Sequence, residues 1–211
     1  MKINYIILSL ILLTTSNIFG QKKSNFGLNA GLTYSSIYGF DKSYIPHERS
    51  LAMGYLVGIT FEYEINEDIS IITNLNYEKK IIGHKLVSND EGEGLKPDVV
   101  KMTMNYNYIT LPILLKYDFS SNFYINAGPY VGYLINRIDK GGGYSEDTSE
   151  FTEKMDFGLT TSIGYLILLD KNKISFELRN NLGLINTSSY PVIDNGTNKN
   201  HSIGIVAGFL F

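Results

Sequence analysis

Seven charged residues stand in segments where large apolar side chains alternate with small or polar ones, and all seven fall on the small, polar parity. They are Glu62, Glu64, Glu78, Lys80, Lys116, Glu177 and Arg179. Carboxylates beside Lys and Arg could pass protons or ions through a narrow interior, or could hold one another in ion pairs. Because a buried isolated charge is costly, we interpret these residues as a structural charge network that fills an interior.

The three histidines do not form a catalytic or metal-binding pattern. A nucleophilic site needs His beside Ser and an orienting group. The histidines and the serines closest to them in sequence are His47, His84 and His201 with Ser43, Ser88 and Ser202. No spacing links these residues, and no two histidines stand at the i, i+4 spacing of a metal site. We therefore predict no enzyme, no metal and no cofactor.

Two polar segments are acidic and rich in small residues. "NDEGEGLKPD" covers residues 89–98, and "SEDTSEFTE" covers 145–153. Carboxylate oxygens are suitable ligands for divalent cations, but neither segment has the twelve-residue EF-hand pattern. We interpret both as solvated connections.

The elements that position the charges are strands. In "DFGLTTSIGYLILLD", residues 156–170, Phe157, Leu159, Ile163 and Tyr165 share one parity, and Gly, Ser and Thr dominate the other. A period of two indicates a strand, because successive side chains point to opposite faces. The same pattern recurs over 25–36, 53–64, 69–80, 106–119, 123–136, 174–184 and 201–211.

The connections between these segments alternate in length. "INED", "DFSSN" and "DKNK" are short, and the others are long and polar. Alternation of this kind is typical of an up-and-down transmembrane barrel. Strands of about 9–11 residues cross a bilayer, and only a closed barrel pairs all their backbone groups there. The sequence therefore predicts an all-β fold, an eight-stranded antiparallel up-and-down transmembrane β-barrel.

Such a barrel has an apolar outside and a lumen filled by side chains. Tyrosines on the outward parity, such as Tyr34 and Tyr77, would form an aromatic girdle. Lys79 is outward too, so we expect it at the interface, where its stem can snorkel. Pro112 and Pro129 fall inside strands and cannot donate a ladder hydrogen bond, so each requires a bulge or an unpaired partner.

The first 20 residues have the layout of a secretory signal peptide, with Lys2 before an apolar run that is too short to cross a bilayer. We therefore expect a signal peptide over 1–20 and the barrel over 21–211. The expected location is the outer membrane, with both termini periplasmic and the long loops extracellular. The chain has no cysteine and a net charge of −3 without a basic stripe, so neither disulfides nor nucleic-acid binding is expected.

Three passages carry a family resemblance: "YITLPILLKYDF", "YINAGPYVGYLIN" and "DFGLTTSIGY". With the terminal Phe211, they resemble the PorT-like outer-membrane β-barrel family, within the OmpA/OmpX-like group of small barrels. The resemblance implies insertion by the outer-membrane barrel assembly machinery, with Phe211 as the signal. PorT itself is associated with a dedicated protein-secretion system, and both prolines stand where the family commonly has one.

Three functions remain open. The first is a structural, binding or envelope-complex component, surrounded by outer-membrane lipid and binding an unknown extracellular ligand or envelope protein. The second is a narrow ion or small-solute channel through the lumen. The third is a secreted lipocalin-like carrier whose apolar parity points inward to a ligand. The third is disfavoured, because a water-facing surface normally carries more Lys and Glu than the polar parity does here.

Overall fold

The computed structural model describes residues 24–39, 48–50, 52–87, 99–189 and 197–211. The expected signal peptide lies outside the described residues, as do Ser43, His47 and Ser88. The elements are β1 (Ser24–Tyr38), β2 (Glu48–Ser50), β3 (Met53–Glu64), β4 (Ile69–Val87), β5 (Val99–Asp118), β6 (Phe123–Gly141), β7 (Tyr144–Asp147), η1 (Ser149–Phe151), β8 (Met155–Leu168), β9 (Lys173–Gly183) and β10 (Lys199–Leu210). Within these residues, no helix has the length and hydropathy needed to cross a membrane.

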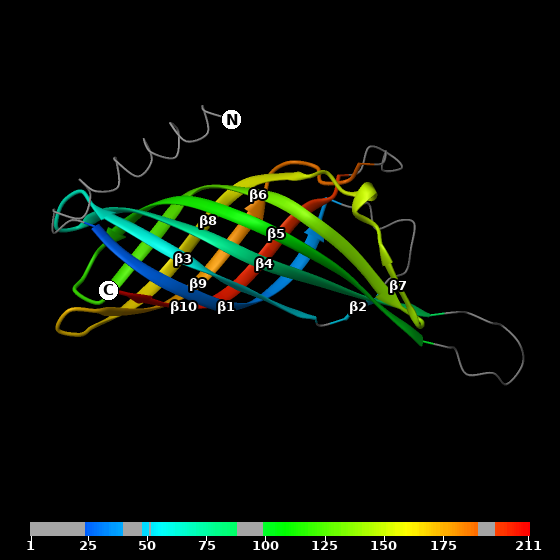
Figure 1. Cartoon of the computed structure of the whole chain (residues 1–211), viewed down its shortest axis with the longest axis horizontal. Coiled ribbons are helices and arrows are strands. Elements are labelled where there is room, and N and C mark those ends of the chain that lie inside the picture. The colour runs from blue at the N-terminus through cyan, green and yellow to red at the C-terminus, as the bar shows by residue number, and fades with distance from the viewer. Residues whose placement is uncertain (1–23, 40–47, 51, 88–98, 190–196) are drawn as a thin grey trace, which may run out of the picture.

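The strands close into a ring (Figure 1). Its order is β1-β3-β4-β5-β6-β8-β9-β10, each strand is antiparallel to the next, and β10 pairs back to β1. The two short strands stand outside the ring, β2 on β4 and β7 on β6. Closure gives every strand two hydrogen-bonded neighbours, which is the condition for crossing hydrocarbon. The predicted eight-stranded antiparallel barrel is confirmed.

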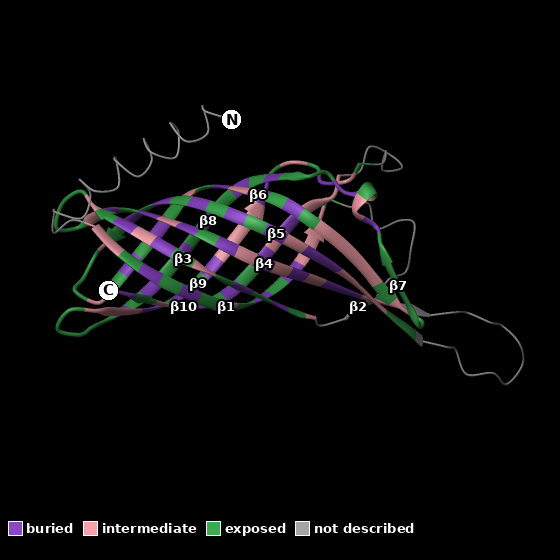
Figure 2. Cartoon of the chain, in the orientation of Figure 1, coloured by how far each residue is buried: buried purple, intermediate pink, exposed green. Residues whose placement is uncertain are grey.

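The apolar parity faces outward. Buried and exposed residues alternate along the strands (Figure 2). Leu28, for example, is 57% exposed, whereas its neighbour Asn29 is 5% exposed. The outward side of every ring strand is a belt of Leu, Ile, Val, Phe and Tyr, and we call this surface the outer wall. The lipocalin-like interpretation, which needs the apolar parity inside, is therefore wrong.

The two ends of the barrel differ in construction. At one end the connections are short, over 65–68, 119–122 and 169–172, and we call this the turn end. At the other end, the loop end, β4, β5 and β6 are 19, 20 and 19 residues long and continue past the apolar belt. Flanked by β2 and β7, these continuations form what we call the loop-end sheet. Segments expected to be loops are thus partly strand, because polar alternation gives no hydropathy signal.

The two strand prolines interrupt the ladders locally. The β4–β5 register is continuous up to Thr73↔Ile113 and resumes at Asn76↔Thr110, so Pro112 falls in the gap. The β5–β6 register has a similar gap beside Pro129. The expectation of an unpaired partner is confirmed, while the β-bulge of this pair lies elsewhere, between Asn107 and Tyr108.

Large inward tyrosines fill the lumen against glycines. Tyr124 stands opposite Gly164, and Tyr130 stands opposite Gly158, in the β6–β8 register. A Cβ at either glycine would collide with the ring of its tyrosine. These glycines therefore provide the space in which the two rings lie across the lumen.

Candidate functional site

Charged side chains at the turn end of the lumen share several partners. Lys116 Nζ donates to Glu62 Oε1 at 2.7 Å and lies 3.2 Å from Asp118 Oδ2. Lys173 Nζ lies 2.9 Å from Glu64 Oε1 and 3.8 Å from Glu62 Oε2. The cluster draws on β3, β5 and β9, whose inward parities meet at this rim. Each lysine contacts two carboxylates, and Glu62 lies within reach of both lysines.

The middle of the lumen contains one charge pair within a single strand. Arg179 donates to Glu177 Oε2 through Nη2 at 2.8 Å and through Nε at 3.1 Å. The other oxygen, Glu177 Oε1, accepts from the Tyr124 hydroxyl at 3.0 Å. Both charged residues are buried, and these bonds satisfy both oxygens of the carboxylate. The arrangement joins β9 to β6 across the lumen.

A third cluster surrounds Asp156, which is 0% exposed, towards the loop end. Its Oδ2 accepts from Asn200 Nδ2 at 2.8 Å, from the Tyr130 hydroxyl at 3.1 Å and from Lys80 Nζ at 3.4 Å. Lys80 Nζ also lies 4.9 Å from the ring centroid of Tyr108, within range of a cation–π contact. This loop-end cluster ties β4, β6, β8 and β10 together.

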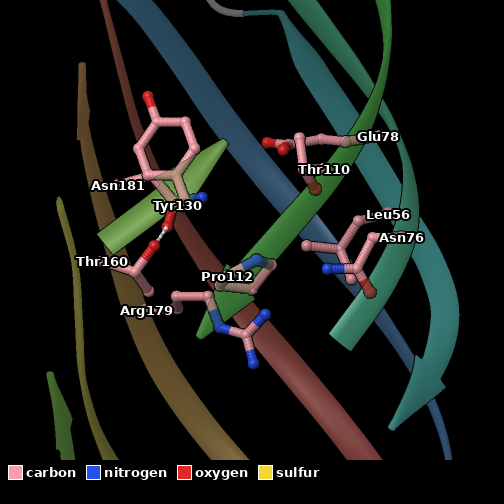
Figure 3. A pocket seen from close by; sticks show the side chains of 9 residues that line it. All are labelled: Leu56, Asn76, Glu78, Thr110, Pro112, Tyr130, Thr160, Arg179 and Asn181. Atoms are coloured by element: carbon pink, nitrogen blue, oxygen red, sulfur yellow. Dashed lines mark hydrogen bonds between the residues drawn. The ribbon is translucent and has the colours of Figure 1, made fainter. Parts of the chain in front are cut away.

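Glu78 lines a small cavity between the middle and loop-end clusters. The cavity has a volume of about 10 Å³, room for about one water molecule. The Glu78 carboxylate and the Arg179 guanidinium reach it from strands β4 and β9 (Figure 3). Glu78 is 1% exposed, and its Oε1 has no hydrogen-bond partner within the described residues. A bound water is the simplest donor to this oxygen.

Apolar side chains close the lumen beyond the loop-end cluster. Ile82, Tyr106, Tyr108 and Leu134 form a buried cluster, against which Ile37 and Met104 pack. We call these residues the apolar cap. A hydrated ion would have to lose most of its water to pass these packed side chains, because the hydroxyls of Tyr106 and Tyr108 are the only polar side-chain groups of the cap. Within the described residues, packed side chains and the charge clusters fill the lumen and can hold the strands together.

All seven residues predicted as a lumenal network lie inward, but they form three clusters with Glu78 between two of them, rather than one network. Asp118, Asp156 and Lys173 also take part, and the sequence analysis missed them. Asp156 has the inward parity and could have been found from it. Asp118 and Lys173 stand at strand ends. The sequence analysis assigned them to the turns "DFSSN" and "DKNK", so it did not assign their side chains to the inner or the outer face. The structural role of these charges stays a prediction.

Of the three histidine and serine pairs of the sequence analysis, only His201 and Ser202 lie entirely within the described residues, and they point to opposite faces of β10. Ser202 lies inward and accepts from Asn181 Nδ2 at 3.4 Å, whereas His201 is on the outer wall. His84 lies in β4, and no described serine from the predicted set accompanies it. Among the described residues, no three His, Cys, Asp or Glu side chains gather as a metal site would require.

Three solved structures of outer-membrane proteins are similar to this chain at low sequence identity. Neisserial surface protein A has a TM-score of 0.46 and 14% identity over 89% of this chain and 95% of that chain. Ail, the attachment invasion locus protein of Yersinia pestis, has a TM-score of 0.41 and 13% identity, over 90% of this chain and 99% of that chain. The outer membrane protein W of E. coli has a TM-score of 0.40 and 12% identity, over 90% of this chain and 100% of that chain. Similarity at this level supports no inference about binding or activity.

No curated protein matches the sequence. The family pattern of the outer membrane protein beta-barrel domain matches residues 16–189, which is most of the chain. Together with the closed ring and the apolar outer wall, this match identifies the family: the chain belongs to the outer-membrane protein β-barrel domain family.

Proposed function

We propose that this outer-membrane barrel is a closed scaffold that holds the loop-end sheet at the cell surface, where the sheet binds an extracellular ligand or an envelope protein. The observation that carries the proposal is the contrast between a sealed lumen and three ring strands that continue beyond the belt. Strands are rigid, so a surface built on them is held in place better than one built on loops.

The orientation is part of the proposal. The turn end would face the periplasm with both termini, and the loop end would face the exterior, as in other barrels with short periplasmic turns. Residues 1–20 would be the export signal. Phe211 would be the assembly signal, read by the barrel assembly machinery; its backbone N–H donates to Phe26 O at 2.8 Å where β10 closes on β1.

Conductance tests the proposal against the channel alternative. The full chain is reconstituted into planar bilayers, and a sealed lumen predicts no reproducible current steps. Reproducible steps that are lost in Lys116→Met or Glu62→Gln would favour a channel and would contradict the scaffold. Cell-surface labelling of a cysteine introduced at Tyr144, which is highly exposed on β7, tests the orientation separately.

The PorT-like resemblance suggests a narrower role in an envelope complex that serves protein secretion. Deletion of the gene followed by comparison of secreted proteins tests this role, and unchanged secretion would exclude it. The prediction that the chain is not an enzyme rests on the sequence alone.

A further inference from the structure

Three polar side chains form a hydrogen-bonded chain on the outer wall. Ser36 Oγ lies 3.4 Å from His201 Nδ1, and His201 Nε2 lies 2.8 Å from Asn180 Oδ1. The residues come from β1, β10 and β9, three adjacent strands of the ring. Ser36 stands directly opposite His201 in the β1–β10 register, while Asn180 is opposite Ile203, two residues further along β10. No sequence motif indicates this hydrogen-bonded arrangement, because only the pairing register of the strands brings the three residues together.

The order hydroxyl, imidazole, amide oxygen is the order of an acyl-transfer site. The imidazole takes the proton of the hydroxyl, and the third group fixes the tautomer and the orientation of the ring. With a proton on Nε2, His201 donates to Asn180 Oδ1, and Nδ1 is left to accept the proton of Ser36. The two ring nitrogens are thus used in the reverse of the serine-protease order, in which Nε2 faces the hydroxyl. The separation of 3.4 Å is loose, as is common in such sites before substrate binds.

The location of these three polar residues defines the substrate class. Along the same face towards the turn end, the outward side chains are apolar or aromatic, among them Tyr34, Leu178 and Ile203, each at least a third exposed. Tyr34 is only two residues from Ser36 and has the place of a girdle residue. The three polar residues therefore stand where hydrocarbon gives way to headgroups. In a phospholipid, that boundary is the level of the acyl ester bonds.

A cation lies on the same face beyond the imidazole. Lys199 is two residues from His201 in β10, and it stands opposite Tyr38 in the register with β1. It makes no ion pair within the described residues. Its ammonium offers the positive charge that a phosphate headgroup or a developing oxyanion needs.

We propose that Ser36, His201 and Asn180 form an acyl-ester hydrolase site on the outer wall, acting on phospholipids of the leaflet at the loop end. Ser36 Oγ attacks the ester carbonyl, and His201 Nδ1 takes the proton. The ester C–O bond breaks, and His201 returns the proton to the departing lysolipid oxygen. Water then attacks the acyl-serine, gives a proton to His201 and releases the fatty acid, while Ser36 regains its proton. The net reaction consumes one ester and one water.

The scaffold function does not depend on this site, because it concerns another surface of the barrel. A second polar cluster on the outer wall shows what a purely structural arrangement looks like. The Tyr77 hydroxyl donates to Asn107 Oδ1 at 2.8 Å, and Asn107 Nδ2 donates to Asn136 Oδ1 at 2.5 Å. That cluster also satisfies polar groups beyond the belt, but it contains no imidazole or other base that could activate the Tyr77 hydroxyl.

The test uses the full chain refolded into phosphatidylethanolamine vesicles. Released fatty acid is measured, and a fluorophosphonate probe reports an activated serine by peptide mass spectrometry. The expected result is fatty acid release and labelling at Ser36. Ser36→Ala abolishes both, and His201→Gln lowers the rate by about 100-fold or more, as for loss of a general base. Asn180→Ala weakens release without removing the nucleophile.

Two matched variants control for the fold. Ser35→Ala removes the adjacent serine, which is buried on the inner face, and Asn107→Ala breaks the second polar cluster. Both should keep the wild-type rate, and every variant must show the heat-dependent gel shift of a folded barrel. Folded wild-type protein that releases no fatty acid and takes no label overturns the proposal. Release that survives in Ser36→Ala overturns it as well.

Discussion

The two ends of the lumen contain the same kinds of charges in different surroundings. In the turn-end cluster, Lys173 is 28% exposed, and Glu62 has two lysines within reach. In the loop-end cluster, Lys80 and Asp156 are fully enclosed, with the apolar cap beyond them. Water can reach the first cluster and replace a lost partner. At the second cluster, the small cavity beside Glu78 has room for only about one water molecule.

This difference indicates how much each charge matters to the fold. A partly exposed ion pair adds little stability, because solvent screens it and it restricts long side chains. A buried charge that loses its partner is left without compensation and destabilises the folded state strongly. The free energy of unfolding should therefore respond far more to changes near the cap than to changes at the turn end.

The largest effect is expected for Lys80→Met. Asp156 and the nearby Glu78 would lose the cation closest to them, and the free energy of unfolding should fall by about 3–5 kcal/mol. Urea unfolding from phospholipid vesicles, followed by the gel shift, measures this change. In the double variant Lys80→Met/Asp156→Asn, part of the loss should return because the uncompensated carboxylate is gone. A loss no larger than that of Lys116→Met would contradict the comparison.

Lys116→Met should have an intermediate effect, of about 2 kcal/mol, measured in the same way. Its ammonium lies 2.7 Å from the buried Glu62, but Glu62 keeps Lys173 at 3.8 Å. This variant shows whether the loss of stability depends on the burial of the charge or on the number of its remaining partners. An unchanged free energy of unfolding would rule out a structural role for the turn-end cluster.

Lys173→Met should cost less than about 1 kcal/mol, since the side chain is partly exposed and its partner Glu64 is 34% exposed. The same urea titration at low and high salt should show that most of this small loss disappears as salt screens the pair. A loss as large as that of Lys80→Met would mean that the turn end is as dry as the loop end.

The smallest effect is expected outside the lumen, at Asp147 in β7. Hydrogen bonds from the Ser149 hydroxyl and backbone N–H hold the pKa of this exposed carboxyl below its ordinary value. The stabilisation is present above the ordinary pKa and is lost as the pH falls through the lowered one. Ser149→Ala should raise the pKa of Asp147 towards its ordinary value, as carboxyl carbon NMR would show. An unmoved pKa would mean that the backbone bond alone sets it.

The period-two pattern was enough to predict the ring of strands and which side chains line its lumen. In a membrane barrel, every strand alternates apolar side chains facing outward with polar or small side chains facing inward. Leu28 and Asn29 illustrate it, since adjacent residues take opposite environments. The same rule placed all seven charged residues in the lumen. The loop-end sheet was missed where the rule loses its signal, as in β4 beyond Lys79, where the side chains on both faces include polar ones.

Contacts between strands could not be predicted from the sequence, because they depend on register. Ser36 and His201 are 165 positions apart and meet only through the pairing of β1 with β10. The sequence analysis considered only the serine nearest to His201 in sequence, Ser202, which points to the other face. Parity alone excluded that pair, since adjacent residues of a strand cannot share a face.

The pairing of the first ring strand with the last also constrains how the molecule folds. Gly27 pairs with Leu210, so the barrel cannot close until nearly the whole chain has been made and delivered. Before that moment, β1 and β10 each present an unpaired edge, which invites pairing with other chains in water and is costly in lipid. Contacts so distant in sequence form slowly. Closure of the ring is therefore expected to be a late step of folding, because it needs both β1 and β10 in place.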